Sequence, residues 1–186
     1  MSKIIKKSIA ASLLIAIGCM VLLTVGAPLG AFLFSFGLLT VCSLDLYLYT
    51  GRCGYVVAQK NWKVLGIILL VNLAAGWLIG ALVGVISPAL VPLAAAKILT
   101  WTNPFIHFVQ AIFCGGIMFI AVEIKKRGSV LGILLGVPVF ILCGFQHCIA
   151  NIIYLGMALA FNPIIILSII GNLLGALGIW FLSRDD

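Results

Sequence analysis

Charged residues are scarce in this sequence, and acidic ones are almost missing. Only 8% of the 186 residues are Asp, Glu, Lys or Arg, and just four of these are acidic. Hydrophobic residues make up 65% of the chain. A soluble domain of this length needs a charged surface, so the composition excludes that class and indicates a polytopic membrane protein.

The residue clusters that metal and redox sites require are also missing. The six cysteines lie in or beside apolar runs, and no two have CxxC spacing. We therefore expect small buried thiols and neither disulfides nor a zinc site. Cys143, His147 and Cys148 are close in sequence, but no further candidate ligands cluster with them, so no metal and no cofactor are expected.

What the chain does contain is six apolar segments, each long enough to cross a hydrocarbon core of about 30 Å. The first could pass for a signal peptide, but no small-x-small cleavage site follows it, which predicts a retained helix. The segments are Ser8 to Gly26, Gly30 to about Val57, Val64 to Ile86, Phe105 to Val122, Val130 to Ala160 and Pro163 to Leu182.

The net charge of +7 does not indicate a nucleic-acid-binding surface, because the basic residues fall between the apolar segments. Their positions instead indicate how the chain is oriented in the membrane. Ten of the eleven precede or follow segments on one side, and only Lys97 lies on the other. This asymmetry predicts a multi-pass protein of the plasma or inner membrane with both termini in the cytoplasm.

The fifth segment is unusual because it is both over-long and polar at its centre. Residues 130–160 form an uncharged run too long for one straight crossing and too short for two. Gly144, Gln146, His147 and Asn151 lie near its middle, where unpaired polar groups are most costly. We therefore predict two half-helices that meet at a non-helical segment lining a pore, with His147 at its centre.

The two halves of the chain resemble each other. Asn72-Leu73 in the third segment matches Asn172-Leu173 in the sixth, and the second segment is over-long and polar like the fifth. The prediction is one all-α channel domain, residues 1–186, with an aquaporin-like inverted 3+3 repeat. Its halves are about 1–90 and 98–186, and segments two and five are the broken helices.

Residues Phe145-Gln146-His147-Cys148-Ile149-Ala150-Asn151 resemble the F-E-H-S-x-A-N signature of the formate/nitrite transporter family. Further stretches resemble that family in the same order along essentially the whole chain. They are Phe34-Ser35-Phe36-Gly37-Leu38, Leu48-Tyr49-Thr50-Gly51, Asn61-Trp62 with Asn72-Leu73, Ala94-Ala95-Ala96-Lys97, and Ile170-Gly171-Asn172-Leu173-Leu174-Gly175.

This resemblance implies a homopentamer in the lipid bilayer, with one pore per protomer for small monovalent weak-acid anions such as formate, nitrite or hydrosulfide. By matching positions, His147 is the central histidine, Thr50 and Asn172 are the polar groups beside it, and Lys97 attracts the anion. Gln146 and Asn151 complete the polar pore set. The implied apolar constrictions are Phe34, Leu38, Leu48, Met118 and Phe140.

Three positions depart from the family pattern. The family's Glu beside the histidine is Gln146, its acidic residue before the loop Thr is Tyr47, and its helix-four Asn is Gly115. Asp45 could substitute for the acid at Tyr47, and its carboxylate is expected either to pair or to line the pore. These departures bear on substrate choice and proton coupling more than on the fold.

The pore chemistry predicts that substrate crosses the apolar constrictions as the neutral acid, because a bare anion has a large desolvation cost there. Three alternatives remain. A neutral-solute channel is disfavoured because the chain has no N-P-A motif. A membrane enzyme or haem protein would need His107 to join His147, although His107 is expected at the membrane interface. A transport-inactive scaffold is the third. We expect no enzymatic activity.

Overall fold

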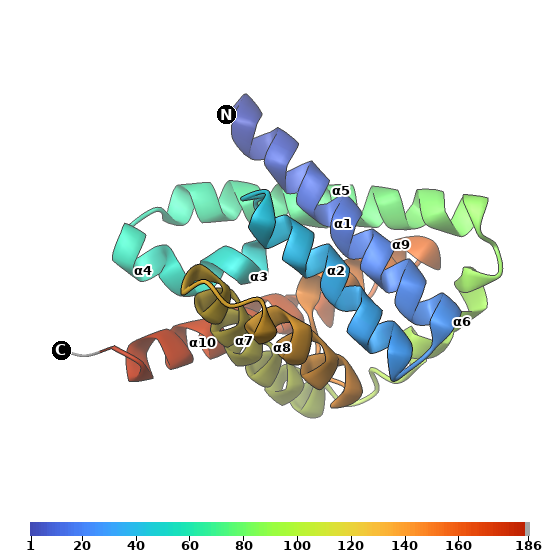
Figure 1. Cartoon of the computed structure of the whole chain (residues 1–186). Helices are drawn as coiled ribbons and strands as arrows, with labels where there is room; N and C mark the ends of the chain where they lie inside the picture. The colour runs from blue at the N-terminus through green and yellow to red at the C-terminus, as the bar shows by residue number, and fades with distance from the viewer. Residues whose placement is uncertain (185–186) are drawn as a thin grey trace.

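The computed structural model describes residues 1–184, and every regular element in that range is a helix (Figure 1). The predicted all-helical class is confirmed for this part of the chain. The elements are α1 Ser2–Val25, α2 Leu29–Ser43, α3 Tyr49–Arg52, the 3₁₀ turn η1 Cys53–Tyr55, α4 Val56–Gln59, α5 Trp62–Ile86, α6 Leu90–Leu99, α7 Pro104–Lys126, α8 Leu131–Leu142, α9 Cys148–Met157 and α10 Ile165–Leu182.

Four helices in the described part of the chain, α1, α5, α7 and α10, are long and apolar enough to cross a membrane. The break predicted inside 130–160 is present, because α8 ends at Leu142 and α9 begins at Cys148. The second apolar segment is broken as well, between α2 and α3. The largest differences from the prediction are that α1 begins early enough to include the first lysines and that the short helix α6 was not predicted.

The two breaks share one backbone conformation. Asp45 and Gly144 occupy corresponding positions with φ of 48° and 71°, a left-handed region open to Gly and tolerated by Asp. Leu48 and His147 then adopt extended backbone and precede α3 and α9. In each break the chain leaves one helix, turns and re-enters a helix within a few residues.

The long helices pack in pairs at very close range. α7 lies against α10, α5 against α9, and α1 against both α2 and α5. At the α7–α10 contact the backbone of Gly175 directly faces the Ile112 carbonyl, and Gly115 directly faces the Asn172 carbonyl. Small residues allow this approach, as at many membrane helix contacts, and no side chain at Gly115 would fit.

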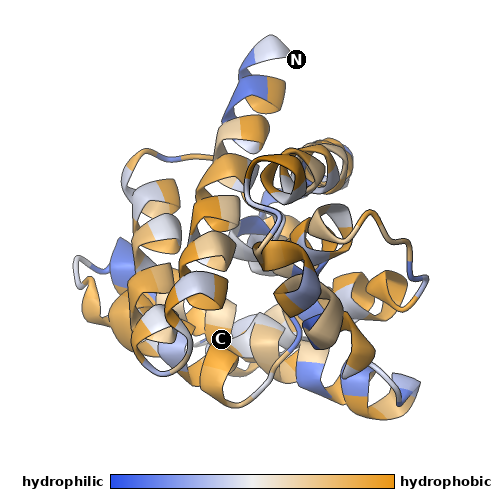
Figure 2. Cartoon of the chain, turned by 90° about the vertical axis from the view of Figure 1, so that its right-hand side faces the viewer, coloured by the Kyte–Doolittle hydropathy of each residue, from blue (hydrophilic) through white to orange (hydrophobic). Residues whose placement is uncertain are grey.

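The outward surface of the bundle is apolar. Hydrophobic residues dominate the outer sides of the helices in Figure 2. Leu70, Leu78 and Phe181 are among the many large hydrophobic side chains that are more than half exposed. Exposed apolar area on this scale marks contact with lipid or with another protein.

We predict that Gly175→Ala destabilises the protein while Gly178→Ala in the same helix does not. A Cβ at position 175 would collide with the Ile112 carbonyl, whereas nothing lies within 4 Å of a Cβ at position 178. Overpacking costs roughly 1–3 kcal/mol. The melting temperature of each purified variant in detergent measures the difference, and equal values would contradict the packing described.

Candidate functional site

His147 is the first residue of the site, and the break fixes its orientation. The residue is 2% exposed and forms the N-cap of α9, where its Nδ1 accepts a hydrogen bond from the Ala150 backbone N–H at 3.1 Å. The first N–H groups of a helix have no partner within the helix. The imidazole supplies one, so α9 itself holds the ring in place.

Thr50 faces His147 from the other break. Thr50 Oγ1 lies 2.9 Å from His147 Nε2, and both residues are buried. A backbone N–H can only donate, so Nδ1 is the acceptor and the neutral ring carries its hydrogen on Nε2. Nε2–H therefore donates to Thr50 Oγ1, and the Thr50 hydroxyl keeps its own hydrogen for a second partner. The pair presents one N–H and one O–H donor at the same point.

Aromatic rings cover the pair on one side. The Phe140 ring stacks on the His147 ring with 5.6 Å between centroids, and Phe34 meets Phe140 edge-on at 6.1 Å. These rings, His147 and Asn151 line a cavity of about 20 Å³, together with Leu22, Lys97, Ile141, Phe145, Ala150 and Tyr154. This volume holds about one water molecule.

Apolar residues of α2 and the first break lie beside a second cavity. Leu38 and Leu48 are 1% exposed and line this larger cavity of about 450 Å³. Four of the five predicted constriction residues therefore border one cavity or the other. Met118 is equally buried but lines neither cavity.

Two asparagines hold the breaks in matching ways. Asn172 Nδ2 donates to the Gln146 and Ala111 carbonyls, both at 2.8 Å, and its Oδ1 accepts from the Cys148 N–H at 2.9 Å. Asn72 repeats the pattern on the first break. Its Nδ2 donates to the carbonyls of Tyr47 and Ser8, and its Oδ1 accepts from the Tyr49 N–H.

Gln146 and Asn151 belong to a buried chain of side-chain hydrogen bonds. Gln146 Nε2 donates to Gln110 Oε1 at 3.0 Å, and Asn151 Nδ2 donates to Gln146 Oε1 at 3.0 Å. Asn151 Nδ2 also donates to Ser168 Oγ at 3.2 Å, and Ser168 Oγ lies 2.6 Å from His107 Nε2. The chain joins α7, the second break, α9 and α10.

His107, Gln110 and Ser168 were not predicted as part of the site. His107, expected at the membrane interface, lies near the start of α7, where it is 2% exposed and its ring meets that of Trp101. The available signal was helical spacing: His107 and Gln110 are three residues apart, and Ser168 and Asn172 are four apart, so each pair shares one face of its helix.

Lys97 lies at the far side of the small cavity. Its side chain is partly buried, and Nζ sits 5.4 Å from the centre of the Tyr154 ring. The same cavity includes His147. Among the described residues that line this cavity, Lys97 is the one with a permanent charge.

The pairing that was one expectation for Asp45 is present. Its carboxylate pairs with Lys7 at 3.0 Å and with Arg52 at 2.8 Å, and it also lines the larger cavity. Within residues 1–184, no group of three or more His, Cys, Asp or Glu side chains is arranged to hold a metal ion.

We predict that Asn172→Asp disrupts the second break. An aspartate keeps the shape but loses both N–H donors, so the buried Gln146 carbonyl of the break is left unpaired at about 1–3 kcal/mol, and the link to the Ala111 carbonyl of α7 is lost as well. The melting temperature should fall clearly. Asn162→Asp is the matched control, because Asn162 uses only its oxygen, which accepts from the Ile164 N–H, and aspartate retains that acceptor. If both variants melt at the same temperature, the hydrogen bonds of Asn172 do not stabilise the second break.

Comparison with known proteins gives the same picture. The solved structure of an "FNT family ion channel" matches with a TM-score of 0.81 at 18% identity, covering 97% of this chain and 90% of that one. A "pentameric formate channel with formate bound" matches with a TM-score of 0.77 at 18% identity, covering 97% and 96%. No curated protein matches significantly. The family model for formate/nitrite transporters matches residues 1–184. This multi-pass membrane protein therefore belongs to the formate/nitrite transporter family.

Proposed function

We propose that the chain is a six-span channel built as an inverted 3+3 repeat, with residues 1–186 forming a single domain. Each broken segment, α2 with α3 and α8 with α9, would count as one crossing beside the four long helices. The matched hydrogen bonds of Asn72 and Asn172 support the repeat, because they join equivalent atoms in the two halves.

Both termini would lie in the cytoplasm. The positive-inside rule supports this orientation, since ten of the eleven basic residues fall on one side of the crossings. In Figure 1, α4 and the C-terminus lie at one end of the bundle and α6, which carries Lys97, lies at the other. The larger cavity then opens to the cytoplasm and the smaller one faces the outside of the plasma or inner membrane.

The pore would carry small monovalent weak acids such as formate, nitrite or hydrosulfide. The observation that carries this proposal is the buried His147–Thr50 pair, which offers two donors between two apolar constrictions. Lys97 would attract the anion from outside, and Phe34 with Phe140 and Leu38 with Leu48 would form the constrictions. Met118 is proposed to support them from behind.

The permeation step follows from the cost of moving charge through apolar surroundings. A dehydrated anion between phenylalanine or leucine side chains is strongly disfavoured, whereas the neutral acid is not. We propose that the anion displaces Thr50 from His147 Nε2–H and accepts hydrogen bonds from both groups. It then takes up one proton from the water on the entry side and leaves the site as the neutral acid, while the imidazole stays neutral. Asn172, Gln146 and Asn151 would act by fixing the break, since their amides bond to neighbouring groups of the protein.

We also propose that the working unit is a homopentamer with one pore in each protomer. The related solved structure described as a pentameric formate channel supports this assembly. The exposed apolar helix faces of a protomer supply surface for both subunit and lipid contacts.

Transport into proteoliposomes that hold a pH-sensitive dye tests the proposal. Formate, nitrite, hydrosulfide, acetate, lactate and glycerol are supplied in turn, and we expect flux of at least one small acid. His147→Ala removes a hydrogen bond to an ion worth about 1.5–3 kcal/mol, so its flux should fall by about tenfold or more.

Cys143→Ala is the matched control, because Cys143 lies in the same break but is exposed and outside both cavities. It should transport like the wild-type protein. Flux of glycerol alone would favour a neutral-solute channel, and a folded oligomer without any flux would favour a scaffold.

Flux should also depend on external pH. If the acid crosses as its neutral form, each further unit of pH, once the pH is well above the acid's own pKa, lowers the neutral fraction and the initial rate by about tenfold. The dye assay between pH 5 and 8 measures this dependence. A rate that does not change over that range would mean that protons take no part.

A further inference from the structure

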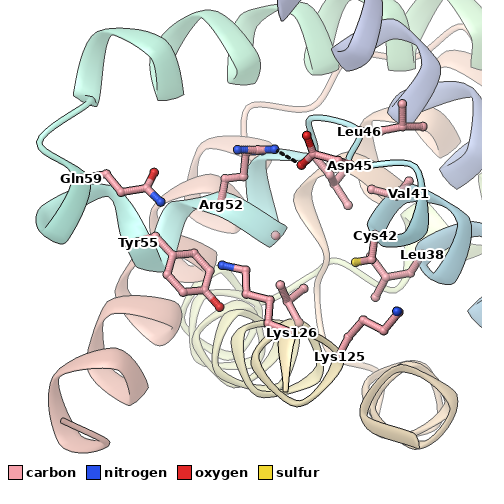
Figure 3. Close-up of a pocket in the computed structure, with 13 residues that line it drawn as sticks. Leu38, Val41, Cys42, Asp45, Leu46, Arg52, Tyr55, Gln59, Lys125 and Lys126 are labelled. Carbon is pink, nitrogen blue, oxygen red and sulfur yellow. Dashed lines mark hydrogen bonds and ion pairs between the residues drawn. The ribbon is translucent and has the colours of Figure 1, made fainter. Parts of the chain in front are cut away.

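The larger cavity has a lining unlike that of the rest of the site. Figure 3 shows side chains from α2, the first break, α3, η1 and the end of α7 arranged around a single space of about 450 Å³. Its inner end is apolar and includes Leu38 and Leu48. Its outer part is polar and is lined by Asp45, Arg52, Tyr55, Gln59, Lys125 and Lys126.

The charge of this lining is strongly positive. Three basic side chains border the cavity and only one acidic side chain does, and that one, Asp45, is already paired with Lys7 as well as with Arg52. Lys125 and Lys126 make no ion pair with any residue in 1–184. The nearby Glu123 is bound to Arg127 and Tyr55. Positive charge without a local counter-ion favours a bound anion.

Aromatic rings hold two of these cations in place. The Arg52 guanidinium lies 3.9 Å from the centre of the Tyr47 ring, and the Lys126 Nζ lies 3.2 Å from that of Tyr55. Cation–π contacts of this kind keep long side chains in one region. Figure 3 shows the Arg52 guanidinium turned toward Asp45 and the Lys126 ammonium turned toward the Tyr55 ring, and both residues line the cavity. The groups are therefore already gathered before any anion arrives.

The size of the cavity does not suit the proposed substrates. Binding pockets for small organic molecules measure about 300–1,000 Å³, and this cavity falls in that range, whereas a one-carbon acid needs far less room. A multiply charged anion that filled it could not continue between Leu38 and Leu48, because two or more charges would lose their hydration there.

We propose that this cavity binds a dissolved, multiply charged phosphate compound, which plugs the pore from the cytoplasmic side. Arg52, Lys125 and Lys126 would contact the phosphate oxygens, as Arg and Lys do in phosphate sites. The cavity reaches Leu48, two residues from Thr50, so it lies on the pore and not on the lipid-facing surface. The plugging role rests on the proposed function, whereas the binding does not.

Calorimetric titration of the detergent-purified protein with pyrophosphate tests the binding without any transport. We expect saturable binding that weakens at least tenfold in the double variant Lys125→Gln/Lys126→Gln. Lys60→Gln/Lys63→Gln removes the same charge from residues outside the cavity and should bind like wild type. Each variant is first checked for an unchanged melting temperature. Lys125→Gln replaces the cavity double variant, and Lys60→Gln the control, if either fails to fold.

Pyrophosphate is then sealed inside proteoliposomes made with neutral or with anionic lipid, and acid flux is measured. Inhibition of acid flux in both kinds of proteoliposome supports the proposal that the phosphate compound plugs the pore. Absence of saturable binding, equal weakening in the two double variants, block only with anionic lipid, or passage of pyrophosphate itself would overturn the proposal. Binding without flux of any acid would uphold the site while contradicting the channel function.

Discussion

A helix that breaks at membrane depth frees peptide N–H and C=O groups, and lipid offers them no partners. In this protein one buried asparagine binds one carbonyl and one N–H of each break and ties them to a neighbouring helix. Asn172 binds the Gln146 carbonyl and the Cys148 N–H, and also the Ala111 carbonyl of α7. Asn72 binds the Tyr47 carbonyl and the Tyr49 N–H, and also the Ser8 carbonyl of α1.

The His147–Thr50 pair is one consequence. His147 can point its Nε2–H toward Thr50 only because α9 restarts at the next residue and its Ala150 N–H fixes Nδ1. The departures from the family pattern are compatible with the hydrogen bonds at the second break. Gly115 leaves room for the Asn172 carbonyl, and the Gln146 amide donates to the Gly144 carbonyl, which a carboxylate in its place would repel. Both residues preserve the break.

Much of this was predictable from sequence because polar residues within apolar runs are conspicuous. The break around His147 followed from the length of the run and the Gly, Gln and Asn in it, and the family motifs pointed to Thr50. The Gln110–Ser168–His107 connection was not predicted, because it depends on which faces of α7 and α10 meet. The sequence does not show whether a Gly or Ser at those contacts faces lipid, protein or a cavity.

The two ends of the proposed pore are unequal: a narrow, aromatic cavity beside Lys97 and a wide, basic one beyond the leucines. We propose that anions bind between these cavities, at His147 and Thr50 of each protomer. A cryo-electron microscopy structure in lipid nanodiscs with the transported acid present tests this binding site. We expect a five-fold particle with anion density between Thr50 Oγ1 and His147 Nε2 in every protomer. Density on the five-fold axis, with an intact and unoccupied His147–Thr50 hydrogen bond, would contradict it.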